Sequence, residues 1–263
     1  MFSPCRHTVP IFRFDSRYPW LNGTGVFIIV DNQHFVVTAA HVVEASARKI
    51  AFGYQPPDQA WVDMFGHEAL PIIKAQAQAN ERDPQRAVYR DGLDLAIIMM
   101  PTQHTSWLKE RYTPFDLRSN QRPEAVGVVI VAGWPARTNK YDERKRQFGD
   151  RFGCYPIQSQ ALDKELVRKM GGDPETHIAL QMDKDNFIDI STGKPAGRLF
   201  ALNGVSGGGV WDMYLADQDQ FPNCARSLAG IIVEDHDDKN MAMAIRADNI
   251  WYPLVQKLGL RPH

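Results

Sequence analysis

Short hydrophobic runs, each bounded by glycine, proline or polar residues, recur along the whole chain. Most of them are rich in Val, Ile, Phe and Thr, a composition and length typical of β-strands. They predict strands over residues 24–30, 35–39, 49–54, 95–100, 126–132, 178–182, 209–213, 228–233 and 241–246. Because Asp31-Asn32 is a strong turn signal, the first two strands are predicted to form an antiparallel hairpin. The pattern therefore indicates a protein dominated by β-strands.

Two segments have helical spacing instead. Residues 160–170 place hydrophobic side chains three or four positions apart and end at Gly171-Gly172, a natural left-handed cap. Residues 249–258 have one hydrophobic face and predict a terminal helix packed against the body.

The proline-containing stretch 101–123 separates two strand-rich halves and is predicted to be a linker between lobes. For the highly charged stretch 137–151, a solvated loop is favoured over a substrate-binding patch.

Composition and charge restrict the function. The chain has 263 residues, 44% of them hydrophobic and 23% charged, which is ordinary for a globular protein. Its formal net charge of -1 argues against general electrostatic binding to nucleic acid or to an anionic membrane. We therefore expect no nucleic-acid or membrane partner, and look for function in a local site.

The sequence also bears on the compartment. No hydrophobic run approaches the ~20 residues that span a bilayer, and the first residues lack the pattern of a secretory signal, so a cytoplasmic protein is expected. The 3 cysteines are far apart in the sequence and predict reduced thiols rather than disulfides or a zinc site. Asn22-Gly23-Thr24 has the form of a glycosylation sequon but is interpreted as a turn entering a strand.

Three polar residues lie in unusual surroundings. Ser206 lies in the glycine-rich run Gly204-Val205-Ser206-Gly207-Gly208-Gly209, whereas His41 and Asp94 adjoin hydrophobic strand sequence. A serine nucleophile needs a histidine to accept its proton and a carboxylate to orient that histidine. The backbone N–H groups of Gly204 and Ser206 would form an oxyanion hole. Ser206, His41 and Asp94 are therefore the candidate catalytic residues.

Five segments then resemble, in chain order, the signature segments of a known family, the chymotrypsin-like (trypsin-fold, clan PA) serine peptidases. They are Thr24-Gly25-Val26-Phe27, Thr38-Ala39-Ala40-His41, Asp94-Leu95-Ala96-Ile97, Gly204-Val205-Ser206-Gly207-Gly208 and Gly230-Ile231-Ile232. Gly133-Trp134-Pro135, which follows a hydrophobic strand, adds a resemblance to the bacterial trypsin-like branch that includes the HtrA proteases. The resemblance runs from about residue 20 to about residue 256.

This resemblance implies an all-β fold of two antiparallel six-stranded β-barrels with a C-terminal α-helix. Residues 1–115 would form the N-terminal barrel, 116–248 the C-terminal barrel and 249–263 the terminal helix of a single peptidase domain. It implies hydrolysis of peptide bonds through an acyl-enzyme, without a metal or an organic cofactor. No PDZ domain of the HtrA type is expected to follow.

Departures from the family pattern concern activation and specificity. Many secreted members have an aspartate before the serine that pairs with a newly cleaved N-terminus, and Val205 cannot do this. At the base of the primary pocket the family pattern places Phe200, which does not support a preference for Arg or Lys. Val233, Glu234 and Asp235 continue the strand that resembles the substrate-pairing strand, so the acidic pair could favour basic substrates. A solvated turn explains these two acidic residues equally well.

The sequence thus predicts an intracellular serine endopeptidase whose partners are protein or peptide substrates and, in addition, an activating protein. The alternative is a catalytically silent peptide-binding module on the same fold. The acidic run at 234–238 could attract a cation, but it lacks the spacing and the glycine of a calcium loop, so no metal is expected.

Overall fold

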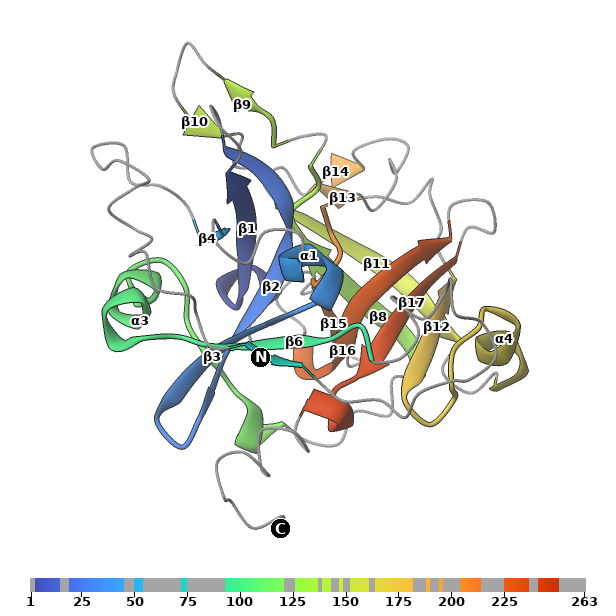
Figure 1. Cartoon of the computed structure of the whole chain (residues 1–263). Coiled ribbons are helices and arrows are strands. Elements are labelled where there is room, and N and C mark those ends of the chain that lie inside the picture. The colour runs from blue at the N-terminus through green and yellow to red at the C-terminus, as the bar shows by residue number, and fades with distance from the viewer. Residues whose placement is uncertain are drawn as a thin grey trace.

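The computed structural model consists mainly of two β-sheets that lie side by side (Figure 1). It describes residues 3–14, 19–44, 50–53, 72–74, 93–120, 126–136, 139–142, 147–148, 152–160, 164–181, 188–189, 194–195, 204–213, 225–236 and 241–250. Among these residues no helix is long and hydrophobic enough to cross a membrane.

The first half of the chain forms a 7-stranded sheet with the order β4-β1-β2-β3-β6-β5, and β7 pairs in parallel with β2. The strands are β1 (Thr8–Phe14), β2 (Pro19–Val30), β3 (Gln33–Thr38), β4 (Ile50–Phe52), β5 (Ile72–Lys74), β6 (Ala96–Met99) and β7 (Phe115–Asp116). Asp31 and Asn32 join β2 to β3 with φ angles of 46° and 63°, as a tight hairpin turn requires. The predicted hairpin is confirmed.

The second half forms an 8-stranded sheet with the order β12-β17-β16-β15-β8-β11-β13-β14, and β12 also pairs with β11. This additional pairing closes the path from β12 to β11 into an antiparallel barrel. The strands are β8 (Val126–Gly133), β11 (Gly153–Gln160), β12 (His177–Gln181), β13 (Ile188–Asp189), β14 (Lys194–Pro195), β15 (Gly209–Met213), β16 (Ala225–His236) and β17 (Met241–Arg246). A separate hairpin contains β9 (Tyr141–Asp142) and β10 (Gln147–Phe148).

Within the described ranges the helices are short. They are α1 (Ala40–Glu44), α3 (Thr102–Lys109) and α4 (Lys164–Lys169), with 3-10 turns at Pro4–Arg6 and Leu117–Ser119; residues 248–250 are also helical. The helix predicted at 160–170 begins only at Lys164, because residues up to Gln160 belong to β11 and pair with β8. Gly171 ends α4 with a φ of 88°, as predicted. The predicted linker at 101–123 contains α3, and residues 251–263 of the predicted terminal helix lie outside the described residues.

The two sheets meet through buried aromatic side chains. Trp211 of β15 is fully buried, and its ring packs edge-on against Phe115 at 5.3 Å between centroids. The Trp134 indole N–H donates to the Thr8 carbonyl oxygen at 3.2 Å, which joins the residue after β8 to β1. Burying such large side chains removes much hydrophobic surface from water, so this contact holds the two halves in a fixed relation.

Candidate active site

Strand pairing brings His41 and Asp94 together. In the antiparallel pair of β3 and β6, Thr38 lies opposite Ala96, so the residues after β3 adjoin those before β6. The chain turns into α1 at this edge, and the Ala40 N–H donates to the Asp94 carbonyl oxygen at 3.1 Å. Two residues 53 positions apart in the sequence therefore meet at one end of the first sheet.

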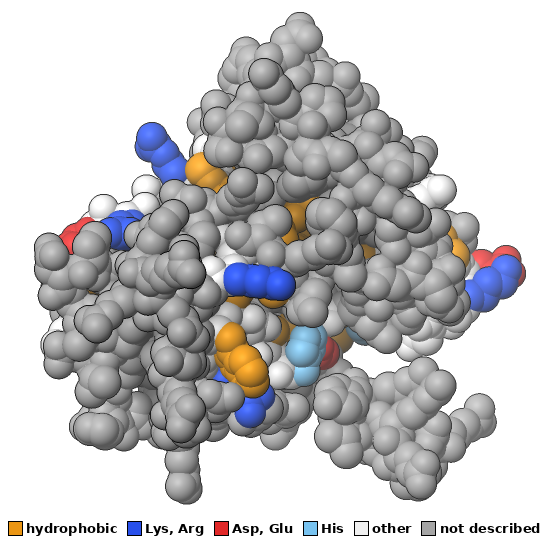
Figure 2. Space-filling model, turned by 90° about the horizontal axis from the view of Figure 1, so that it is seen from above, with side chains coloured by type: hydrophobic (Ala, Val, Ile, Leu, Met, Phe, Trp, Pro, Cys, Tyr) orange, Lys and Arg blue, Asp and Glu red, His pale blue; other side chains and the backbone are white. Residues whose placement is uncertain are grey.

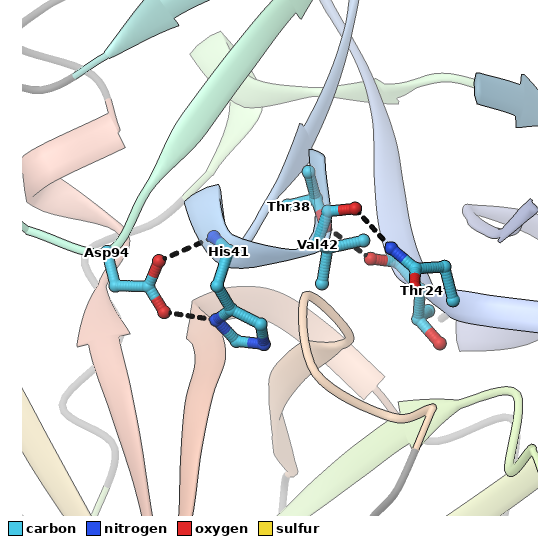
Figure 3. Close-up of polar contacts among 6 residues, drawn as sticks. Thr24, Thr38, His41, Val42 and Asp94 are labelled. Atoms are coloured by element: carbon cyan, nitrogen blue, oxygen red, sulfur yellow. Dashed lines mark hydrogen bonds and ion pairs between the residues drawn. The ribbon is translucent and has the colours of Figure 1, made fainter. Parts of the chain in front are cut away.

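Both carboxylate oxygens of Asp94 hold His41 (Figure 3). Oδ1 accepts from the His41 backbone N–H at 2.9 Å, and Oδ2 lies 2.5 Å from the ring Nδ1. Because a carboxylate oxygen can only accept, Nδ1 carries the hydrogen and the neutral ring keeps its lone pair on Nε2. In Figure 3 the second ring nitrogen faces away from Asp94. His41 is thus held in the tautomer that a general base needs.

This pair remains accessible to solvent. The His41 side chain is 34% exposed and that of Asp94 is 20% exposed. The face in Figure 2 exposes a histidine beside an acidic side chain, with hydrophobic and basic side chains close by. A substrate could therefore reach the imidazole without rearrangement of the described residues.

Hydrogen bonds to the second sheet shape the turn that carries Ser206. The Gly207 N–H donates to the Ile232 carbonyl oxygen at 2.7 Å, and the Ile232 N–H returns a bond to Gly208 at 2.9 Å. Inside the turn, the Gly208 N–H donates to the Val205 carbonyl oxygen at 2.7 Å. Val205 is fully buried in the core of the second barrel, whereas Ser206 is partly exposed. Hydrogen bonds to β16 and the buried Val205 side chain thus hold the turn in place, whereas Ser206 remains partly exposed.

Two glycines of this turn have left-handed backbone conformations. Gly204 has a φ of 90° and Gly207 a φ of 84°, which residues with a Cβ rarely adopt. A Cβ on Gly204 would lie 2.8 Å from the Trp134 carbonyl oxygen, and one on Gly207 would overlap the Thr24 carbonyl oxygen and the Thr38 hydroxyl. The glycine-rich sequence around Ser206 is therefore required by both backbone angle and space.

The predicted oxyanion donors lie in this same turn. Neither the Gly204 N–H nor the Ser206 N–H donates a hydrogen bond to another part of the chain that the structure describes. Amides without an internal acceptor are what stabilisation of a developing oxyanion requires. Both groups are therefore available for the predicted role.

Gly23 connects the serine turn with the histidine helix. The Thr24 N–H donates to the Ser206 carbonyl oxygen at 2.8 Å. A Cβ on the preceding residue, Gly23, would lie 2.6 Å from Val42 Cγ1 and 3.1 Å from that same oxygen. Ser206 and the residue after His41 thus approach one glycine from two sides. The hydrogen bonds of the described residues include none between Ser206 Oγ and the His41 ring.

The predicted specificity residues have separate positions. Phe200 lies outside the described residues. Val233 is buried at an irregularity of β16, and the next two residues, Glu234 and Asp235, pair with β17. β15 pairs with β16 as far as Ile231, and the Ser206 turn bonds Ile232; from Val233 onward no described strand pairs with this edge of β16. An extended peptide could pair with this edge.

No group of three or more His, Cys, Asp or Glu residues within the described ranges is arranged to hold a metal ion.

The sequence interpretation missed the residues that support the site. Asn22 donates its side-chain N–H to the carbonyl oxygen of Val42, next to His41, and Thr24 contacts the Ser206 turn. In the sequence, the two residues stand out only as parts of a sequon and of a family segment. A buried threonine in a hydrophobic strand is an available signal, but it does not reveal the partner.

Neither a protein-family model nor a curated protein sequence matches the chain. Solved structures do match. Scabies mite inactivated protease paralogue S-I1 is 14% identical, and the match covers 97% of this chain and 96% of that one with a TM-score of 0.52. The VesB protease of Vibrio cholerae is 14% identical over 96% of this chain and 64% of its own, with a TM-score of 0.49. The M. tuberculosis Rv3671c protease in its active form is 17% identical over 98% and 83%, with a TM-score of 0.45.

The match at a TM-score of 0.52 shows the fold. Together with the two antiparallel sheets it confirms the predicted chymotrypsin-like double β-barrel fold, with one closed barrel and one half-barrel in the described residues. At this identity the likeness concerns the fold alone. Function has to be argued from the site itself.

Proposed function

We propose that this protein is a serine endopeptidase that hydrolyses peptide bonds through an acyl-enzyme on Ser206. The observation that carries the proposal is the double hold of Asp94 on His41. A carboxylate that binds both the backbone and the ring of a histidine fixes the position and the tautomer of that base. The glycine-rich turn, which meets Val42 of the histidine helix at Gly23, carries the serine that the sequence pattern assigns to this base.

The mechanism follows from these groups. Ser206 Oγ attacks the substrate carbonyl carbon while its proton passes to His41 Nε2, and Asp94 stabilises the resulting imidazolium. The N–H groups of Gly204 and Ser206 would donate to the oxyanion of the tetrahedral intermediate. The imidazolium then gives its proton to the departing amine, and an acyl-enzyme remains. A water molecule, deprotonated by His41, attacks the ester and regenerates Ser206 Oγ with its hydrogen.

Substrate binding would use the open edge of β16. An extended peptide paired there would bring its scissile bond to the Ser206 turn, which β16 contacts through Ile232. Val233 and the acidic residues Glu234 and Asp235 follow directly, so a preference for basic substrate residues is part of the proposal. A library of peptides would reveal it as enrichment of Lys or Arg near the cleaved bond.

Activation is proposed to differ from that of family members with an aspartate before the serine. Val205 holds the turn through hydrophobic contacts within the second barrel core, which contains Val131 and Ile232. No ion pair with a new N-terminus is therefore needed to seat this residue. Placement in the bacterial trypsin-like branch, an intracellular location and an activating partner stay predictions.

Covalent labelling tests the proposed function. A fluorophosphonate probe should modify wild-type protein, with the adduct mapped to Ser206 by mass spectrometry. Labelling should be lost in S206A and in H41A, whereas S106A, which removes an exposed hydroxyl from α3, should leave it intact. If the wild-type protein binds peptides but is never labelled, the silent binding module is the better account.

A further inference from the structure

Thr24 makes hydrogen bonds to both halves of the molecule. Its side chain is fully buried, and its hydroxyl donates to the Gly204 carbonyl oxygen at 2.7 Å. The same hydroxyl accepts from the backbone N–H of Trp134 at 3.0 Å, and the Thr24 backbone N–H donates to the Ser206 carbonyl oxygen. One residue of β2 thus holds two carbonyl groups of the nucleophile turn, on either side of Val205.

The position of Thr24 is itself fixed within the first sheet. Its carbonyl oxygen accepts from the Thr38 hydroxyl at 2.6 Å (Figure 3). Thr38 is the last residue of β3 and is fully buried, three positions before His41. The chain of hydrogen bonds therefore runs from the strand that leads to His41, through Thr24, to the turn that carries Ser206.

Asn22 holds the other side of the same segment. Its side-chain N–H donates to the carbonyl oxygen of Val42, in the helix that carries His41. Between Asn22 and Thr24 lies Gly23, where a Cβ would clash with the Val42 side chain. The segment Asn22-Gly23-Thr24 thus contacts the histidine helix at one end and the serine turn at the other.

We propose that Asn22 and Thr24 are positioning residues that set the separation and orientation of Ser206 relative to His41. Neither residue needs to touch the substrate. The Thr24 hydroxyl fixes the Gly204 carbonyl, which lies along the backbone between the two proposed oxyanion donors, while Asn22 fixes the helix of the base. The inference rests on the proposed peptidase function and assigns the sequon-like segment a role in that site.

Removing the Thr24 hydroxyl at constant shape tests this role. In T24V the Gly204 carbonyl loses its donor and the Trp134 N–H loses its acceptor. Because displacement of reacting groups by about 1 Å can lower rates about 100-fold, labelling of Ser206 and kcat should fall by up to about 100-fold with little change in KM. T24S keeps the hydroxyl and should restore most of the rate.

A second buried threonine provides the matched control. Thr8 is also fully buried in the first sheet, and its hydroxyl donates to the Pro4 carbonyl oxygen at 2.8 Å. T8V should lower the melting temperature, by less than T24V because one buried hydrogen bond is lost rather than two, and should leave labelling and kcat close to wild type. A merely structural role for Thr24 predicts that the two variants behave alike.

Each outcome decides the proposal. Equal labelling rates for T24V and T8V, in a wild-type protein that is labelled, would overturn this inference and leave the proposed function standing. A wild-type protein that is never labelled would overturn both. If T24V does not fold, N22A decides instead: a fall in kcat of about tenfold at unchanged KM supports the proposal, and an unchanged kcat overturns it.

Discussion

Replacing Asp94 with asparagine changes one atom type in the proposed site and tests the role of the carboxylate. In the native protein both oxygens accept hydrogen bonds, one from the His41 backbone N–H and one from ring Nδ1. Asparagine supplies one acceptor and one donor, so it can satisfy only one of these N–H groups.

The structure indicates which bond is kept. If the amide turned its NH₂ toward the backbone N–H, two donors would face each other, at a cost of about 1–3 kcal/mol. The imidazole can instead move its hydrogen from Nδ1 to Nε2 and accept from the amide. D94N should therefore fold normally but leave His41 unable to accept the Ser206 proton. The same change of tautomer in a serine protease triad lowers kcat by about 10⁴-fold, which corresponds to about 5.5 kcal/mol in activation free energy.

The assay is the second-order rate constant for fluorophosphonate labelling of Ser206, measured near neutral pH for wild type and D94N. Thermal unfolding of both proteins, within a few degrees of each other, would show that the fold is preserved. D94N is expected to be labelled about 10⁴-fold more slowly than wild type. A labelling rate within about tenfold of wild type would refute the tautomer argument.

Three further changes probe the fold around the site. G207A should abolish labelling and lower stability by at least about 1–3 kcal/mol, because a Cβ there would overlap Thr24 and Thr38; denaturant unfolding measures the loss. V205A should cost about 2 kcal/mol by the same assay, since it leaves a cavity under the turn. Burial lowers the pKa of His7 in the folded protein below its usual 6.5. As the pH falls through 6.5, the unfolded chain therefore binds a proton at this residue before the folded protein does, and the free energy of unfolding decreases. H7F should reduce that decrease; an unchanged pH profile would contradict the assignment.

Some of the fold could be predicted because local signals determine it. The strands at 209–213 and 241–246 have the predicted bounds, since hydrophobic runs and turn residues delimit them. The left-handed turn at Asp31 and the cap at Gly171 follow from backbone preferences of single residues.

Other elements depend on tertiary contacts that no local pattern shows. In β11 a proline at position 156 and polar residues at 158–160 weaken the strand signal, yet pairing with β8 on one side stabilises the strand. In α3 only Thr105 and Leu108 are buried, so its hydrophobic face was too narrow to predict a helix.

In the candidate site, too, some residues could be predicted from the sequence and others could not. Ser206, His41 and Asp94 could be selected because each stands out in its own segment, and strand pairing then explains how His41 meets Asp94. The roles of Asn22 and Thr24 could not be predicted, because their partners are mainly backbone groups. Every residue has a backbone carbonyl, and only the folded chain shows which of them a side chain reaches.

Peptide-bond cleavage tests the central claim most directly. A cell extract, which supplies both candidate substrates and activating partners, would be incubated with wild-type protein or with S206A, and new N-termini would be compared by mass spectrometry. The account predicts a set of new N-termini in the wild-type sample that is absent from the S206A sample. Identical sets of N-termini in the two samples would contradict it.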